Sequence, residues 1–136
     1  MNTINLWPIL IASAVAFAIG AIWYSPILFG REWQELTKTS DAEIAAARAS
    51  GMWKRYITQF IATIVAFCVL AFLAAAANLT TFTDGAFLGF LVWLGFSATE
   101  ATSGLLWEKK PFKLVLIQSV GSLVTLVVGG AIIGAW

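Results

Sequence analysis

The basic residues of this 136-residue chain are confined to two short stretches, and long apolar segments flank both. The stretches lie between the first and second apolar segments and between the third and fourth. Their members are Arg31, Lys38, Arg48, Lys54 and Arg55 in the first, and Lys109, Lys110 and Lys113 in the second. Short loops rich in Lys and Arg stay on the cytoplasmic side of a membrane. The pattern therefore predicts a four-span membrane protein with both basic loops in the cytoplasm and both termini outside.

The composition of the chain also indicates a protein that is surrounded by membrane lipid. Only 11% of the residues are charged and 60% are hydrophobic, whereas soluble domains carry about 25% charged residues. The basic residues form no dense patch, which argues against a nucleic-acid partner. The chain has no histidine, the commonest metal ligand and general base. We find no phosphate-binding loop and no metal-ligand spacing, so we expect no cofactor, no metal and no enzymatic activity.

Four segments are long enough to span a bilayer, whose core of about 30 Å needs roughly 20 apolar residues. They cover residues 4–24, 57–78, 84–107 and 112–135. In the first basic loop, Ser40 and Glu43 fit a capping box and Gly51 fits a C-cap, which predicts a short cytoplasmic helix over residues 41–50. The sequence thus predicts an all-α, single-domain, four-helix transmembrane bundle with a cytoplasmic helix between spans one and two.

Small residues recur at a spacing of four along three of the predicted spans. In lipid, such stripes let helices approach closely, within one chain or between copies. The sequence does not choose between these two uses, and we expect a homo-oligomer in contact with membrane lipid. The stripes are Ala12, Ala16 and Gly20, then Gly85 and Gly89, and finally Gly130 and Gly134.

Glu100 is the only ionisable group well inside a predicted span. It lies seven residues before the span's end, about 10 Å from the cytoplasmic interface, where a charge costs about 3 kcal/mol. Ser97 and Ser103 share its helix face, Gln118 should lie at a similar depth, and Thr63 can join them from the second span. Two interpretations stay open. Glu100 either binds a proton or cation in a transport path, or is a neutral structural residue bonded to Gln118 or to its own copy.

The end of the first span forms a second candidate site, which we call the elbow. Pro26 disfavours helix at the residue before it, so the chain should turn along the membrane surface there. Trp23 and Tyr24 would anchor this exit at the interface. The elbow is either purely structural, or it forms a notch with Trp33 and Arg31 that binds a lipid headgroup or ligand.

Three stretches of the chain resemble a family of bacterial membrane proteins catalogued as domain of unknown function 1761. The most specific is Gly20–Gly30, which reads GAIWYSPILFG and is followed by Trp33. The linker Trp107–Leu114 and the tail Gly130–Trp136 are similar to the family's corresponding parts. The resemblance implies a four-helix protein of the bacterial inner membrane. It implies no established activity.

Our leading interpretation of function is transport or permeation of a small solute or ion by an oligomer. The alternative is a non-catalytic membrane component that binds lipid or a partner protein. Under either interpretation, we expect a multi-pass protein of the bacterial inner membrane with its termini on the periplasmic side.

Overall fold

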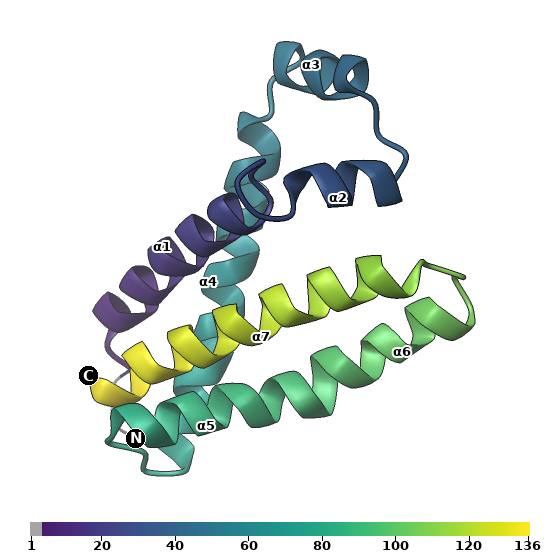
Figure 1. Ribbon diagram of the computed structural model, residues 1–136. Coiled ribbons are helices and arrows are strands. Elements are labelled where there is room, and N and C mark those ends of the chain that lie inside the picture. Colours follow the sequence, from purple (N-terminus) through teal and green to yellow (C-terminus); the bar gives the residue numbers. More distant parts are fainter. Residues whose placement is uncertain (1–3) are drawn as a thin grey trace.

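The computed structural model describes residues 4–136, and every regular element in that part of the chain is helical (Figure 1). The elements are α1 (Leu6–Trp23), α2 (Gly30–Leu36), α3 (Asp41–Ala49), α4 (Trp53–Ala76), α5 (Phe82–Val92), η1 (Trp93–Ala98), α6 (Thr99–Leu106) and α7 (Phe112–Ala135). The segment η1 is a π-helix that joins α5 and α6 without a break. Four helices are long and apolar enough to cross a membrane, namely α1, α4, the continuous α5–α6 rod and α7. The prediction of an all-α fold with four candidate spans is confirmed.

The helix ends differ from the predicted limits mainly at interfacial residues. The second span begins at Trp53 instead of residue 57, because the turn that contains Lys54 and Arg55 is already helical. The helix predicted over residues 41–50 is α3, where the Ser40 hydroxyl accepts from the Glu43 N–H at 3.1 Å. Helix α2 was not predicted, because it is only 7 residues long and too short to show a clear apolar period.

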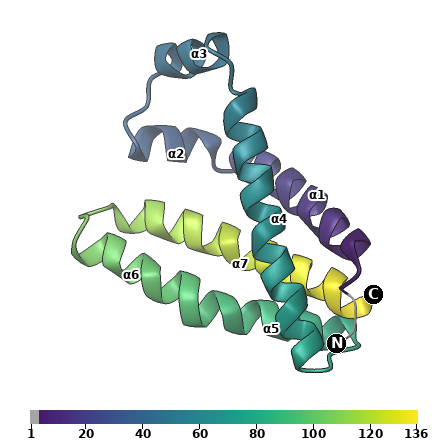
Figure 2. The ribbon, with the colours of Figure 1, turned by 180° about the vertical axis from the view of Figure 1, so that it is seen from behind.

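Helix α7 is the central element of the molecule. It contacts α1, α2, α4 and the α5–α6 rod, with the rod antiparallel beside it and α4 crossing behind it (Figures 1 and 2). A small apolar core lies where α1 meets α4, built on Ile9, Ala12 and Phe67, which are almost fully buried. The fully buried Ser13 hydroxyl donates to the Ile9 carbonyl of its own helix at 2.7 Å, so it leaves no unmet donor in this core.

Four glycines bring the backbones of α5 and α7 into direct contact. A Cβ added to Gly85 would collide with the Gly130 carbonyl oxygen, and one added to Gly130 would collide with that of Gly85. A Cβ on Gly134 would lie 2.5 Å from the Thr81 carbonyl oxygen, and one on Gly89 would also meet α7 backbone. The glycine stripes of the third and fourth spans therefore pack against each other within one chain.

The stripe on the first span is only partly used in this way. Ala12 and Ala16 are buried in the core, whereas a Cβ on Gly20 would meet nothing within 4 Å. The stripe on α1 is therefore closely packed at Ala12 and Ala16 and has open space at Gly20.

Two tryptophans attach α7 to its neighbours by donating to backbone carbonyls. The Trp23 indole N–H at the end of α1 donates to the Ile117 carbonyl at 3.0 Å. The Trp93 indole N–H in η1 donates to the Ser119 carbonyl at 2.8 Å. Successive helix positions differ by about 100°, so Ile117 and Ser119 face in different directions and α7 is held from two sides.

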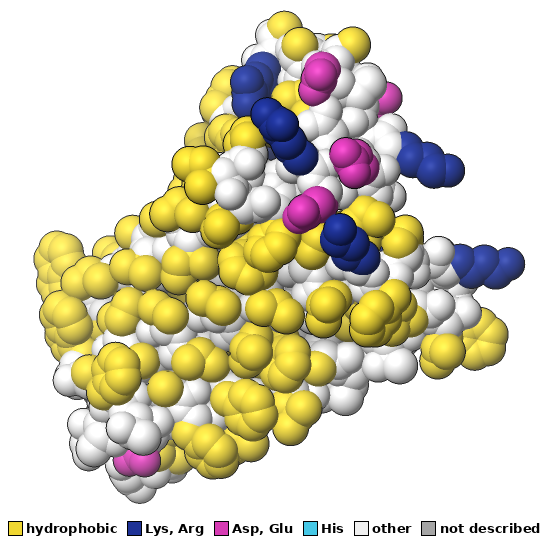
Figure 3. Space-filling model, viewed as in Figure 1, with side chains coloured by type: hydrophobic (Ala, Val, Ile, Leu, Met, Phe, Trp, Pro, Cys, Tyr) yellow, Lys and Arg dark blue, Asp and Glu magenta, His cyan; other side chains and the backbone are white. Residues whose placement is uncertain are grey.

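Most of the charged side chains visible in Figure 3, including all the visible Lys and Arg, lie at one end of the molecule, which we call the basic end. Helices α2 and α3 and the α6–α7 loop lie at the basic end, while the start of α1, the α4–α5 turn and the end of α7 lie at the opposite end (Figure 1). Both basic stretches of the sequence therefore come together in space.

Candidate functional site

A groove of about 430 Å³ lies between α6 and α7, in the half of the helix pair nearer the basic end. We call it the polar groove, because most of its lining side chains carry hydroxyl, amide or charged groups. Its uncharged and acidic polar residues from the spans are Ser97, Glu100, Ser103, Gln118, Ser119 and Ser122. Hydrogen-bonding groups are thus concentrated at membrane depth, on the inner face of a helix pair.

The groove exists because the α5–α6 rod and α7 separate along their length. At the α5 end the glycines hold the two backbones in contact, whereas α6 makes far less extensive contact with α7. The π-helix η1 lies between these two halves. A π-turn adds one residue to a helical turn and often occurs at functional sites. Here the π-helix ends two residues before Glu100.

The structure brings together four of the five residues that the sequence proposed as a polar cluster. Ser97 lies in η1, Glu100 and Ser103 lie on α6, and Gln118 faces them from α7 across the groove. Thr63 is not among the lining residues. It lies on α4, where its hydroxyl donates to the Gln59 carbonyl at 2.8 Å. The depth of a residue within its predicted span thus correctly placed Gln118 of α7 beside Glu100. Thr63 was grouped with them, but it lies on α4, which does not line this groove.

The carboxyl group of Glu100 lies in the lining of the groove and makes no hydrogen bond or ion pair within residues 4–136. In particular, it is not bonded to Gln118, which is one of the two partners that the structural interpretation allows; the other is Glu100 of a second copy of the chain. The other carboxylate in the lining, Glu108, is paired with Lys110 at 3.1 Å. Glu100 is therefore the acidic group of the groove that has no cationic partner in the described chain.

Glu108, Lys110 and Ser119 also line the groove, and the sequence had not singled them out as site residues. The first two belong to the α6–α7 loop, and the Lys110 chain folds back so that its Cδ would lie 3.3 Å from a Cβ on Gly104. No pattern in the sequence of the α6–α7 loop indicates that the Lys110 side chain folds back toward α6. Among residues 4–136, no group of three or more His, Cys, Asp or Glu is arranged to hold a metal ion.

The elbow is a compact turn between α1 and α2. Helix α1 ends at Trp23, and the Phe29 N–H donates back to the Trp23 carbonyl at 3.0 Å. Gly30 begins α2 in close contact with the turn, since a Cβ there would lie 2.5 Å from the Tyr24 carbonyl oxygen. The chain can reverse this tightly because position 30 carries no side chain.

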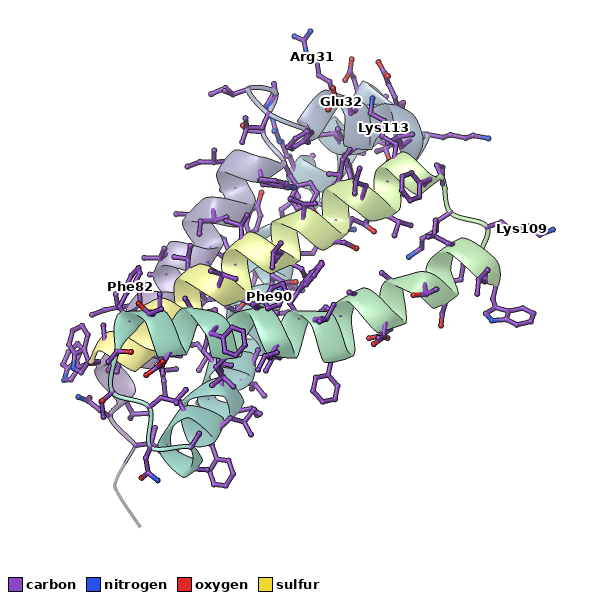
Figure 4. The ribbon with its side chains drawn as sticks, turned by 60° about the horizontal axis from the view of Figure 1, so that its bottom comes forward. Arg31, Glu32, Phe82, Phe90, Lys109 and Lys113 are labelled. Atoms are coloured by element: carbon purple, nitrogen blue, oxygen red, sulfur yellow. The ribbon has the colours of Figure 1, made fainter. Side chains whose placement is uncertain are left out.

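The aromatic residues of the elbow pack on one another. The Trp23 and Phe29 rings lie 4.8 Å apart, and the Tyr24 and Trp33 rings lie 6.5 Å apart, edge to face. Partial burial raises the pKa of the Tyr24 hydroxyl above its ordinary value, which keeps the phenol neutral. Arg31 points away from the body of the molecule (Figure 4). These contacts favour the structural interpretation of the elbow over the notch.

Comparison with known proteins gives a family and no activity. Residues 7–134 match the model of a family described as a protein of unknown function, DUF1761. No curated protein and no solved structure matches the chain. The family match takes in all four candidate spans, the elbow and the polar groove, and it confirms the resemblance carried by the Trp-Tyr-Ser-Pro stretch. The chain belongs to the DUF1761 family, a group of proteins whose function is unknown.

Proposed function

We propose that this protein carries a small hydrophilic solute or ion across the membrane and that the polar groove is its binding site. The observation that carries the proposal is the unpaired carboxyl group of Glu100 in a helix apolar enough to span a bilayer. An ionisable residue at that depth is costly and in membrane proteins usually marks a substrate or ion pathway. We propose binding and passage, not catalysis.

The lining favours a small hydrophilic cation as the solute. With Glu108 paired to Lys110, the carboxyl group of Glu100 remains to attract positive charge. Serine hydroxyls and the Gln118 amide supply oxygen atoms that can coordinate an alkali-metal ion. The same oxygen atoms can accept hydrogen bonds from a hydronium ion or a primary ammonium group. Quaternary ammonium ions are instead recognised by aromatic cages, and none of the residues that line the groove is aromatic.

Membrane orientation and self-association complete the proposal. By the positive-inside rule, the basic end lies on the cytoplasmic side of a bacterial inner membrane and the termini lie on the periplasmic side. The groove would then open toward the cytoplasm. The third span is the least buried of the four. A second copy of the chain packed on the α5–α6 rod would cover this side and shield Glu100 from lipid.

The test is Glu100→Gln in proteoliposomes that contain a pH-sensitive dye or a radioactive alkali cation. We expect saturable flux by the wild type and a loss of about tenfold or more in the variant, because a neutral amide removes a charge-assisted interaction. The oligomer mass should not change. Glu35→Gln is the matched control, since Glu35 is an exposed acid of α2 that lies outside the groove.

Flux by Glu100→Gln equal to that of the wild type would overturn the proposal. A lower melting temperature of the same variant would then assign Glu100 to packing.

A partner-binding role is the second candidate, and the position of α3 favours it. Helix α3 stands off the spanning helices at the basic end (Figures 1 and 2), and none of its residues is buried. If wild-type proteoliposomes show no flux of any cation tested, α3 becomes the element to examine. Replacing it by a Gly/Ser linker should then abolish co-purification of the partner and leave the spans folded.

A further inference from the structure

A second groove lies between α1 and α4 and is distinct from the polar groove. It has a volume of about 290 Å³ and is lined only by Phe17, Tyr56, Ile57, Phe60 and Ile61. Phe17 meets the two aromatic rings of α4 that line the groove edge to face, at 5.9 Å from Tyr56 and 6.0 Å from Phe60. We call it the aromatic groove.

This groove lies beyond the closely packed part of the contact between α1 and α4. Ala12 and Ala16 of α1 are buried in the core that contains Phe67 of α4. Farther along α1, the space around Gly20 is open. The groove therefore begins near the start of α4 and runs from Tyr56 to Ile61, about 7.5 Å into the membrane.

Positive charge lies at the entrance to the aromatic groove. Lys54 and Arg55 directly precede Tyr56, and the first turn of α4 contains no acidic residue. Neither basic side chain has an ion-pair partner within residues 4–136. The Lys54 ammonium lies 5.6 Å from the centre of the Trp53 ring. Trp53 is four residues before Ile57, so this contact draws the ammonium toward the face of α4 that bears the groove.

We infer that the aromatic groove binds an anionic phospholipid, with one acyl chain against Phe17 and Phe60 and the phosphate beside Lys54 and Arg55. The apolar lining matches an acyl chain, and the two unpaired cations at its mouth match a negatively charged headgroup. A juxtamembrane Lys or Arg increases affinity for anionic lipid by roughly fivefold. The inference does not depend on transport through the polar groove.

The experiment is native mass spectrometry of the protein in mild detergent, with equimolar phosphatidylglycerol and phosphatidylethanolamine of identical acyl chains. We expect the wild type to retain mainly phosphatidylglycerol. The double variant Lys54→Gln/Arg55→Gln should lower the ratio of the two bound lipids by roughly 25-fold, the product of two fivefold contributions. Phe60→Ala should reduce retention of both lipids, since it removes part of the surface that the chain contacts.

Lys109→Gln/Lys113→Gln is the matched control, because it removes the same charge from the other basic stretch and should leave the ratio unchanged. Equal retention of the two lipids by the wild type would overturn the inference. So would a control that lowers the ratio as much as the Lys54/Arg55 variant does. If the double variant fails to fold, Lys54→Gln and Arg55→Gln are measured singly, each with an expected change of roughly fivefold.

Discussion

Individual glycines in this chain have opposite roles that depend on their surroundings. At Gly85 the neighbouring helix backbone occupies the space of a side chain, whereas Gly20 faces an empty region. The sequence presents both as members of small-residue stripes. Gly85 and Gly20 differ only in whether a neighbouring helix lies against them. The sequence alone does not show which helices lie against each other.

Replacing Gly85 with alanine should destabilise the protein. The added methyl group would collide with the Gly130 carbonyl oxygen and force α5 and α7 apart, at a cost of about 1–3 kcal/mol. The same change at Gly20 meets no atoms and gains roughly 1 kcal/mol of helix propensity. Unfolding in detergent mixtures should therefore be easier for Gly85→Ala than for the wild type, and no easier for Gly20→Ala. An equal response of the two variants would contradict the close contact.

At the scale of elements, the third span consists of two α-helices joined by a π-helical segment. Each residue turns an α-helix by about 100°, and a π-turn contains one residue more than an α-turn. An α-helix with the same number of residues would direct α6, and with it Glu100, differently relative to the glycine contact of α5.

Deleting Gly95 should convert η1 to regular α-helix and leave solute binding close to that of the wild type. The deletion removes the one residue that a π-turn adds, so α6 keeps nearly the same direction relative to α5, and the open space around Gly95 means that no packing contact is lost. Gly95→Ala keeps the number of residues and serves as the control, with binding expected to match the wild type. Binding is measured as the solute-dependent rise in melting temperature, and loss of binding by the deletion variant alone would show that the π-turn itself is required to place Glu100.

The sequence predicted the four spans and four of the residues that line the polar groove. Apolar runs of more than 20 residues need lipid, and Glu100 and Gln118 were paired because their distances from the span ends agree. The separation of α6 from α7, the return of Lys110 and the π-helix were not predictable. Each depends on how two helices pack. The choice between a π-turn and an α-turn changes a hydrogen-bond register and leaves the apolar pattern almost unaltered.

At the scale of the whole molecule, the charges divide the protein into two ends. Both basic stretches and the acidic residues of α2 and α3 lie at the basic end, while Asp84 lies in the first turn of α5 near the opposite end. A membrane that surrounds the apolar middle would then contact the exposed aromatic side chains of α5, such as Phe87 and Phe90.

Labelling of single cysteines with a membrane-impermeant maleimide tests the orientation. In a Cys68→Ala background, Thr80→Cys in the α4–α5 turn should react in intact bacterial cells, whereas Ala49→Cys at the end of α3 should react only after lysis. The positive-inside rule is the reason for this expectation. The reverse pattern of reactivity would place the basic end, and with it the mouth of the polar groove, in the periplasm.

The glycine contact between α5 and α7 also determines how the α5–α7 hairpin can deform. A hairpin fastened at one end behaves as a lever, whose displacement grows with distance from the fixed point. A small change of angle at η1 would leave the fastened half in place, yet it would widen or narrow the distance between Glu100 and Gln118. The glycine contact between α5 and α7 would thus stay fixed while α6, which carries Glu100, moves relative to α7.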